Sequence, residues 1–256
     1  MAYDLSDALV EQLVTLARQA GDITMTYYNT DFDVRSKGDN TPVTEADEKA
    51  ESLIRDELNR LTPEIPFIGE EAYAAGHRPD ISGGLFWLVD ALDGTKEFVH
   101  KRDEFTVNIA LVENQIPVFG VVHAPAVGDT YWGSVGGAWK TVGGGQAKEI
   151  ASRLPPGDGI TVVASRSHRA GEDEFLEAYT VKDTINSGSS LKFCLIAEGR
   201  ADLYPRLAGT SEWDTAAGHA VLTAAGGSIE TLDGGDFLYG KDQIGNPHFL
   251  AKGRQA

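Results

Sequence analysis

The chain has 256 residues, 41% hydrophobic and 24% charged, with 39 acidic against 22 basic residues and a formal net charge of −17. This composition predicts a soluble globular protein with one large domain or two small ones. The acidity disfavours binding to the phosphate backbone of DNA or RNA. A small anionic substrate stays compatible with it, because a bound divalent cation reverses the local field.

No run approaches the roughly 20 apolar residues that a membrane span requires. Residues 1–13 contain acidic side chains and no continuous apolar block, so we expect no secretory signal. One cysteine, Cys194, excludes an internal disulfide and fits a reducing compartment. These features predict a cytoplasmic protein without an integral membrane span, and leave peripheral membrane association and the oligomeric state open.

The first half of the chain contains two predicted helices and then a series of predicted strands. Apolar residues at helical spacing predict helices over Asp4–Tyr28 and Thr44–Leu61. The predicted strands are Pro66–Gly69, Leu85–Val89, Phe105–Val112, Val118–Val122, Thr130–Ser134 and Ala138–Val142. Short turns with Gly, Pro or Asn join several of them, which predicts antiparallel neighbours.

After a glycine-rich and proline-rich stretch, the pattern changes to short strands that alternate with helices. The predicted strands are Ile160–Ala164, Thr184–Asn186 and Ala201–Tyr204, and the predicted helices are Gly171–Tyr179, Ser189–Glu198 and Trp213–Ala225. This alternation is typical of an α/β half. We therefore predict two halves, residues 1–150 and 151–256, with a soft boundary near residues 143–159.

One acidic turn has the residues that a magnesium and phosphate site needs. A strand that ends at Asp90 and then turns can bring Asp93 beside it, and the Leu92 carbonyl, freed from the sheet, becomes a further oxygen ligand. Mg²⁺ prefers a few carboxylates together with substrate phosphate. Gly94 and Thr95 follow at the start of a predicted short helix, where backbone N–H groups bind anions.

Each acidic residue also has a purely structural interpretation. Asp-Gly is a common turn pair, so residues 90–94 alone favour a plain loop. Asp47 and Asp214 each lie three residues after a Thr or Ser, which is the pattern of a helix cap. Glu70, in a Glu-Glu pair after glycine, would ordinarily lie in a solvated turn.

Three segments considered together resemble the signatures of the inositol monophosphatase superfamily of magnesium-dependent, lithium-sensitive phosphatases. They are Phe67–Glu71, Trp87–Thr95 and Trp213–Gly218. The resemblance covers nearly the whole chain in the expected order. It implies a layered αβαβα sandwich of the sugar phosphatase type, with an antiparallel sheet in the N-terminal half and an α/β C-terminal half.

Further segments are similar to the bacterial 3′(2′),5′-bisphosphate nucleotidase branch of this superfamily. They are Ala164–His168, Ser189–Cys194, Ala197–Arg206 and Glu212–Val221. Ala91 departs from the pattern, since many such nucleotidases have proline there; this loosens the turn without removing a ligand. The implied substrate is 3′-phosphoadenosine 5′-phosphate, hydrolysed to AMP and phosphate. Its 5′-phosphosulfate precursor has the same 3′-phosphate and stays open as a second substrate.

The resemblance implies a site for two or three Mg²⁺ ions. It assigns Glu70, Asp90 and the Leu92 carbonyl to one ion, and Asp90, Asp93 and Asp214 to a second. A third ion would bind near Glu70 through water.

The resemblance also implies how the remaining residues act. Asp47 and Thr95 would orient and deprotonate the attacking water, with the phosphate at Gly94 and Thr95 and no covalent phosphoenzyme.

In the second half, the resemblance implies nucleotide contacts. Lys192 and Arg206 would bind the 5′-phosphate. His168 would contact the nucleoside, and Ser189 would bond phosphate or ribose oxygens.

Several other functions remain alternatives at this stage. An inositol monophosphatase or a fructose 1,6-bisphosphatase would keep the metal residues. A haloacid dehalogenase is disfavoured, because that class uses Asp-x-Asp-x-Thr, whereas Asp90, Asp93 and Thr95 have one more residue between the acids. Outside enzymology, a metal- or nucleotide-binding sensor would keep the scaffold without turnover, although the activating pair Asp47 and Thr95 favours an enzyme.

Overall fold

The computed structural model describes residues 3–30, 34–36, 42–165 and 171–255, and its larger sheet has seven strands in the order β3-β4-β5-β6-β7-β8-β9. They are β3 (Phe67–Gly69), β4 (Leu85–Asp93), β5 (Thr106–Glu113), β6 (Ile116–Ala124), β7 (Asp129–Ser134), β8 (Gly137–Val142) and β9 (Lys148–Ile150). Strands β4 to β9 pair antiparallel in sequence order, and β3 lies parallel to β4. The prediction of antiparallel neighbours joined by short turns is confirmed.

The smaller sheet has five strands in the order β11-β10-β12-β14-β13. They are β10 (Ile160–Ala164), β11 (Val181–Asn186), β12 (Leu203–Arg206), β13 (Ser228–Thr231) and β14 (Phe249–Lys252). Strand β10 is parallel to β11 and β12, whereas β14 is antiparallel to both of its neighbours. A further antiparallel pair, β1 (Val34–Ser36) and β2 (Pro42–Thr44), lies between the first two helices in the sequence.

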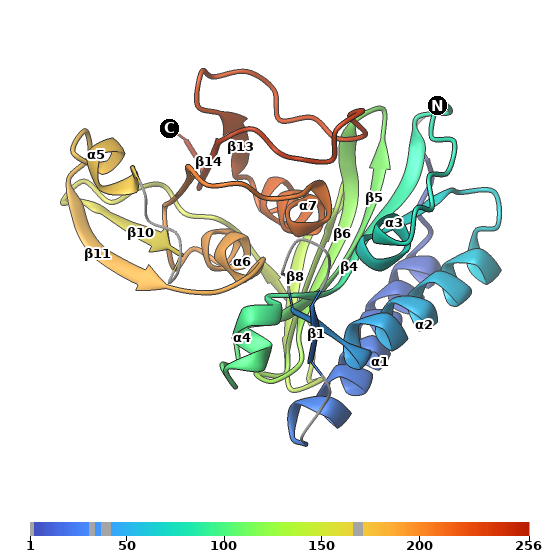
Figure 1. Ribbon diagram of the computed structural model, residues 1–256. Coiled ribbons are helices and arrows are strands. Elements are labelled where there is room, and N and C mark those ends of the chain that lie inside the picture. The colour runs from blue at the N-terminus through green and yellow to red at the C-terminus, as the bar shows by residue number, and fades with distance from the viewer. Residues whose placement is uncertain (1–2, 31–33, 37–41, 166–170, 256) are drawn as a thin grey trace.

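The helices and sheets form five layers (Figure 1). Helices α1 (Asp7–Tyr28) and α2 (Glu45–Leu61) cover one face of the larger sheet, and α6 (Leu191–Ala197) and α7 (Ala216–Ala224) lie between the two sheets. Helix α5 (Glu172–Leu176) packs on the outer face of the smaller sheet, through Phe175 and Leu176. The αβαβα sandwich is therefore confirmed. None of the described helices has the length and apolarity that a membrane crossing requires.

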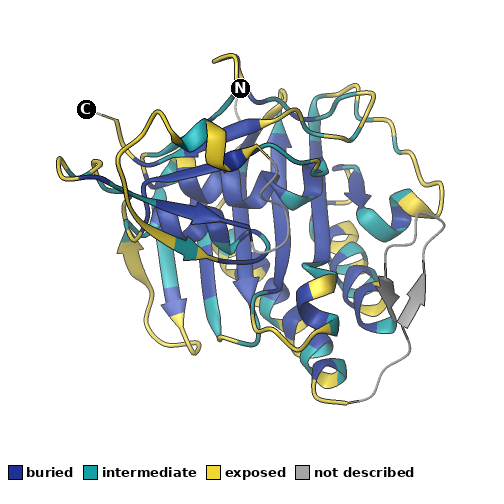
Figure 2. Cartoon of the chain, turned by 60° about the vertical axis from the view of Figure 1, so that its left-hand side comes forward, coloured by how far each residue is buried: buried dark blue, intermediate teal, exposed yellow. Residues whose placement is uncertain are grey.

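Alternation along β4 divides the core between two faces of the larger sheet. Trp87 and Val89 belong to the cluster under α1 and α2, whereas Phe86 and Leu88 belong to the cluster shared with α6 and α7. Figure 2 shows this sheet as the most deeply buried part of the chain. Asp90 continues the second face, so the period of two directs its carboxylate towards the middle layer.

Helix α7 links the two predicted halves. It packs against β6 and β7 of the larger sheet, and a Cβ atom at Gly120 would lie 2.3 Å from the Ala217 carbonyl oxygen. Only glycine allows this approach. The halves therefore share a core, and the division at residue 150 stays a prediction.

Three predicted helices differ from the observed ones at their ends. Helix α1 begins at Asp7, because the Ser6 hydroxyl accepts the Leu9 N–H at 3.3 Å and caps it. Helix α6 begins at Leu191, because Ser189 has a φ of 48°. The helix predicted over 213–225 is divided into η1 (Glu212–Asp214), a 3₁₀ helix, and α7, because Thr215 has a φ of −123°.

The remaining strand and helix predictions differ in smaller ways. Strand β12 begins two residues later than predicted. The predicted helix over 171–179 is shorter, at Glu172–Leu176. Strands β1, β2, β9, β13 and β14 and the short helix α3 (Glu70–Ala74) were not predicted, whereas the short helix expected after Gly94 is present as α4 (Thr95–Val99).

Candidate functional site

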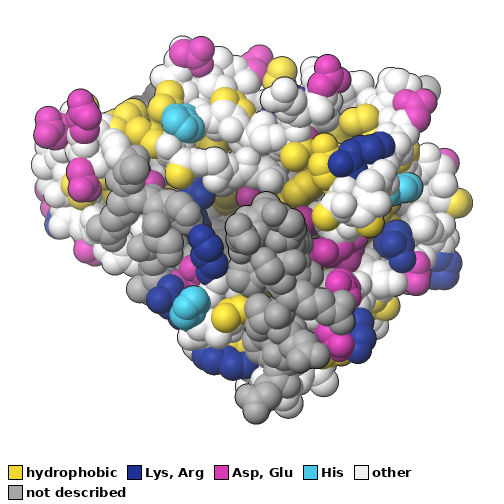
Figure 3. All heavy atoms as spheres, in the orientation of Figure 1, with side chains coloured by type: hydrophobic (Ala, Val, Ile, Leu, Met, Phe, Trp, Pro, Cys, Tyr) yellow, Lys and Arg dark blue, Asp and Glu magenta, His cyan; other side chains and the backbone are white. Residues whose placement is uncertain are grey.

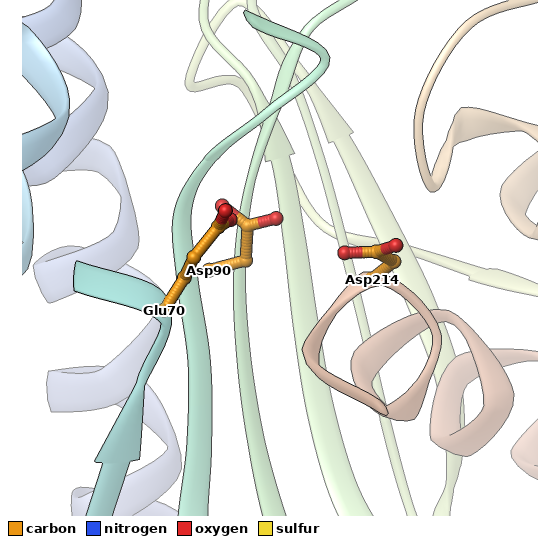
Figure 4. Close-up of side chains that lie close together, drawn as sticks. All are labelled: Glu70, Asp90 and Asp214. Carbon is orange, nitrogen blue, oxygen red and sulfur yellow. The ribbon is translucent and has the colours of Figure 1, made fainter. Parts of the chain in front are cut away.

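Three carboxylates from distant parts of the sequence meet at one end of β4. Ligand oxygens of Glu70, Asp90 and Asp214 all lie within 4.8 Å of one another. Glu70 is the first residue of α3, Asp90 lies in β4, and Asp214 is the last residue of η1. Figure 4 shows Glu70 and Asp90 pointing towards each other, with Asp214 facing them across a gap. The arrangement matches the oxygen donors that a hard divalent cation requires.

A bulge in β4 produces the turn that was expected after Asp90. Asp90 pairs with Asn108, and Asp93 pairs with Thr106, so two residues of β4 oppose one residue of β5. The Leu92 N–H donates to Asp90 Oδ1 at 3.0 Å, which fixes the carboxylate. The Leu92 carbonyl oxygen lies 3.5 Å from the Thr95 hydroxyl. The bulge therefore takes residues 91 and 92 out of the regular ladder, in agreement with the expected turn after Asp90.

Asp214 caps η1 and also belongs to the carboxylate cluster. Its Oδ2 accepts the Ser211 N–H at 2.9 Å, and the two residues form a reciprocal capping box at the start of η1. The same carboxylate belongs to the three-residue cluster. The helix-cap interpretation and the metal interpretation are therefore compatible, because a carboxylate has two oxygens and four lone-pair directions.

Burial and mutual repulsion make this cluster unfavourable without a cation. Burial, followed by the charges of Glu70 and Asp93, raises the pKa of Asp90 well above its usual range. Burial, followed by the charges of Asp93 and Glu70, does the same to the pKa of Asp214. Among the described residues, neither Asp90 nor Asp214 forms an ion pair with Lys or Arg. The donor set therefore fits a divalent cation on chemical grounds.

Asp93 lies beside the cluster and is tied to the second half of the chain. Its Oδ2 accepts the Ser190 N–H at 2.8 Å, the Asn108 side-chain amide at 3.2 Å and the Thr106 hydroxyl at 3.4 Å. These bonds and the nearby Lys192 charge oppose the effect of burial, which still leaves the pKa of Asp93 raised. Asp93 is not one of the three mutually close carboxylates, although its charge acts on both Asp90 and Asp214.

The other residues expected around the reacting phosphate lie close by. Asp47 is 1% exposed in the first turn of α2, and its charge contributes to the raised pKa of Asp90. Thr95 begins α4 directly after Gly94, which has a φ of 94°. A Cβ atom at Gly94 would lie 2.1 Å from the Ser189 hydroxyl oxygen, so glycine is required on both grounds.

A cavity of about 140 Å³ opens beside the carboxylates. Three of the residues expected to bind substrate line it, namely Ser189, Lys192 and Arg206. Lys192 Nζ donates to the Ser189 carbonyl at 2.7 Å and lies 5.3 Å from the centre of the Tyr204 ring. Burial lowers the pKa of Lys192 to about 8. Arg206 donates to the carbonyls of Ala208 and Gly209, both at 3.1 Å. An outer cavity of about 480 Å³ shares Gly94 and Asp214 with this one.

The expected substrate contacts of Ser189 and His168 are not seen in the described residues. The Ser189 hydroxyl donates to the Asp93 carbonyl at 2.8 Å, so in this arrangement its hydrogen is not directed at a phosphate oxygen. His168 lies outside the described residues, and its contact with a nucleoside stays a prediction.

Three buried residues around the carboxylates were missed by the sequence analysis. Glu51 accepts the backbone N–H groups of Glu71 and Ala72 at 2.7 and 2.8 Å, and so caps the helix that begins at Glu70. Asn108 and Ser190 contact Asp93, as described above. One signal was available for Asn108, because it is a polar residue in the middle of a mostly apolar predicted strand.

Basic side chains lie next to the site. Figure 3 shows Lys and Arg side chains immediately to the left of the central grey atoms, whereas Asp and Glu side chains lie to their right among further Lys and Arg side chains. Helix α4 and the turn after it contain exposed Lys96, Lys101 and Arg102. Lys96 lines both cavities. A positive rim of this kind attracts small anions to an otherwise acidic protein.

Comparison with known proteins identifies the family of this chain. The model of the inositol monophosphatase family matches residues 6–254. The chain belongs to the inositol monophosphatase family. Enzymes of this family depend on metal ions, in agreement with the carboxylate cluster of Glu70, Asp90 and Asp214.

Individual family members resemble this chain over nearly their full length. The 3′(2′),5′-bisphosphate nucleotidase CysQ of Escherichia coli K12 is 44% identical over 94% of this chain and 98% of its own length. The CysQ structure from Bacteroides thetaiotaomicron has a TM-score of 0.80 and 33% identity, over 98% of this chain and 100% of that one. An IMPase from Thermotoga maritima has a TM-score of 0.77 and 25% identity, over 95% and 91% of the two chains.

Proposed function

We propose that this protein is a magnesium-dependent phosphomonoesterase that hydrolyses 3′-phosphoadenosine 5′-phosphate to AMP and phosphate. The main support is the cavity that places two buried cations, Lys192 and Arg206, next to the carboxylates of Asp93 and Asp214. A substrate with two phosphate groups can then place one at the metal site and the other at the cations. The 44% identity to a relative named as a bisphosphate nucleotidase supports the same substrate.

The proposed metal is Mg²⁺, with two or three ions in the site. Glu70, Asp90 and the Leu92 carbonyl would hold one ion, and Asp90, Asp93 and Asp214 would hold a second. A third would bind near Glu70 through water. When bound, such ions lower the pKa of water and stabilise the charge of the reacting phosphate.

The protein itself orients the water and the phosphate. Asp47, buried in the first turn of α2, would accept the proton of the attacking water, and Thr95 would orient that water through its hydroxyl. The backbone N–H groups of Gly94 and Thr95 would bind the phosphate oxygens. In this proposal the nucleophile is water, so no residue of the chain becomes phosphorylated.

The second phosphate and the nucleoside would lie in the two connected cavities. Arg206 uses two N–H groups on the carbonyls of Ala208 and Gly209, which fixes its plane and leaves further donors for a phosphate. Lys192 adds a compact charge. The nucleoside would extend into the outer cavity, with His168 as a proposed contact. The 5′-phosphosulfate precursor has the same reacting phosphate and is a second proposed substrate.

Measurement of phosphate release from 3′-phosphoadenosine 5′-phosphate tests this function. We expect AMP and phosphate in Mg²⁺ and no turnover in EDTA. Arg206→Met should raise KM for this substrate at least tenfold and leave KM for adenosine 3′-monophosphate within threefold, because only the bisphosphate has the second phosphate. Turnover in EDTA would contradict the metal assignment, and an equal effect on both substrates would contradict the role of Arg206.

A further inference from the structure

One residue at the start of α6 contacts both Asp93 and Asp214. The Ser190 N–H donates to Asp93 Oδ2 at 2.8 Å, and its hydroxyl donates to the Asp214 carbonyl at 2.7 Å. Ser190 is 1% exposed, so water does not compete for these bonds. It therefore joins two carboxylate-bearing residues that approach the site from β4 and from η1.

A second buried side chain completes the connection. Asn108 Nδ2 donates to the Ser190 hydroxyl at 3.0 Å and to Asp93 Oδ2 at 3.2 Å. Both amide hydrogens are used, and these acceptors fix which end of the amide is nitrogen. Asn108 is fully buried on β5, directly opposite Asp90. The chain of bonds thus runs from the larger sheet through Ser190 to η1.

The backbone before Ser190 is held in an unfavourable conformation. Ser189 has a φ of 48°, in the left-handed region that is unfavourable for a residue with a side chain. Its hydroxyl donates to the Asp93 carbonyl at 2.8 Å, and its oxygen occupies the space that a side chain at Gly94 would take. This conformation aims the Ser190 N–H at Asp93, so the strain has a structural purpose at the site.

We propose that Ser190 and Asn108 are positioning residues that set the separation and orientation of Asp93 and Asp214, and thereby the affinity for the second metal ion. The proposal rests on the proposed function. The hydrogen atoms of both side chains are already bonded, so neither is placed to donate to substrate; they act through the Asp93 carboxylate and the Asp214 backbone carbonyl. Partners of ligating residues typically change metal affinity by 10- to 100-fold.

Ser190→Ala tests this inference against a matched control, Ser152→Ala. Ser152 is also buried, at 3% exposure, and its hydroxyl donates to the Ala225 carbonyl at 2.9 Å, as the Ser190 hydroxyl does to Asp214. Calorimetric titration with Mg²⁺ alone, without substrate, measures ion binding directly. The Mg²⁺ concentration for half-maximal turnover and the Tm in EDTA complete the comparison.

We expect Ser190→Ala to weaken Mg²⁺ binding and to raise the half-saturating Mg²⁺ concentration about tenfold, with turnover restored at high Mg²⁺. Ser152→Ala should keep wild-type Mg²⁺ values at a similar loss of Tm. Ser190→Cys, which keeps the side-chain size and a weak donor, should be intermediate, and it replaces the alanine variant if that variant does not fold.

Unchanged Mg²⁺ binding in the Ser190 variants, or an equal change in Ser152→Ala, would overturn the inference. Failure of the wild-type protein to bind Mg²⁺ or to release phosphate would instead overturn the proposed function, so the two failures are distinguishable.

Discussion

Replacement of Asp90 by Asn should stabilise the metal-free protein and abolish its response to Mg²⁺. Asp90 lies between Glu70 and Asp214, with ligand atoms of all three within 4.8 Å. Asn keeps the shape of the side chain and an oxygen that can accept the Leu92 N–H, which Asp90 accepts at 3.0 Å. The substitution therefore removes mainly a negative charge.

The size of the effect follows from the spacing of the charges. At 4.8 Å, the upper limit of these separations, two unit charges repel by about 3.5 kcal/mol at an effective dielectric constant of about 20. Asp90 has two such neighbours. The raised pKa values of Asp90 and Asp214 favour proton uptake, which offsets part of this repulsion, so we expect a net gain on the order of 1–3 kcal/mol. For a chain of this length the gain corresponds to a rise in Tm of roughly 3–10 °C.

Thermal unfolding of both proteins at pH 8, in EDTA and in Mg²⁺, measures this effect. The wild-type Tm should rise with Mg²⁺, because an ion that binds only the folded state stabilises it. Asp90→Asn should unfold at a higher temperature than wild type in EDTA, show no Mg²⁺ shift and lose at least 10³-fold in phosphate release. Asp242→Asn, which removes an exposed carboxylate, is the control and should behave as wild type. An Asp90→Asn protein that is less stable in EDTA, or that keeps the Mg²⁺ shift, would refute the reasoning.

Two further predictions concern the proposed base and a buried histidine. Asp47→Asn should lower kcat at least 100-fold and leave the half-saturating Mg²⁺ concentration within threefold, because a general base contributes about 10²- to 10⁴-fold to the rate; steady-state kinetics with an intact kcat would exclude this role. Burial lowers the pKa of His219 from 6.5 to about 4, so the stability that the neutral ring confers is present above pH 6.5 and is lost as the pH falls through 4. Urea unfolding between pH 7 and 4 should show this loss in wild type and a flatter dependence in His219→Gln, and identical slopes would contradict it.

Local sequence patterns were sufficient to predict many of the strands and helices, including the strand that carries Asp90 and the turn that carries Asp214. Apolar runs along β4 and β5 predicted both strands, and the capping pattern at Ser211 matches the 3₁₀ turn that presents Asp214. The face of the sheet on which Asp90 lies follows from the period of two along a strand. Only the resemblance to a family predicted that the carboxylates lie in one site. The packing of distant segments against each other leaves no periodic signal in a single sequence.

The contacts across the middle layer could not be predicted. The start of α6 depends on the positive φ of Ser189, which is maintained by bonds to Asp93 rather than by local propensity. Capping of Glu71 and Ala72 by Glu51 likewise requires two helices to be in place. Such contacts arise only after tertiary packing, so no helix or strand pattern indicates them.

Comparative kinetics on two substrates test the central claim most directly. With purified protein in Mg²⁺, we expect kcat/KM for 3′-phosphoadenosine 5′-phosphate to exceed kcat/KM for inositol 1-phosphate at least tenfold. This ratio corresponds to about 1.4 kcal/mol of transition-state binding. The reason is that only the nucleotide has a second phosphate for Lys192 and Arg206. Equal or reversed values would contradict the account.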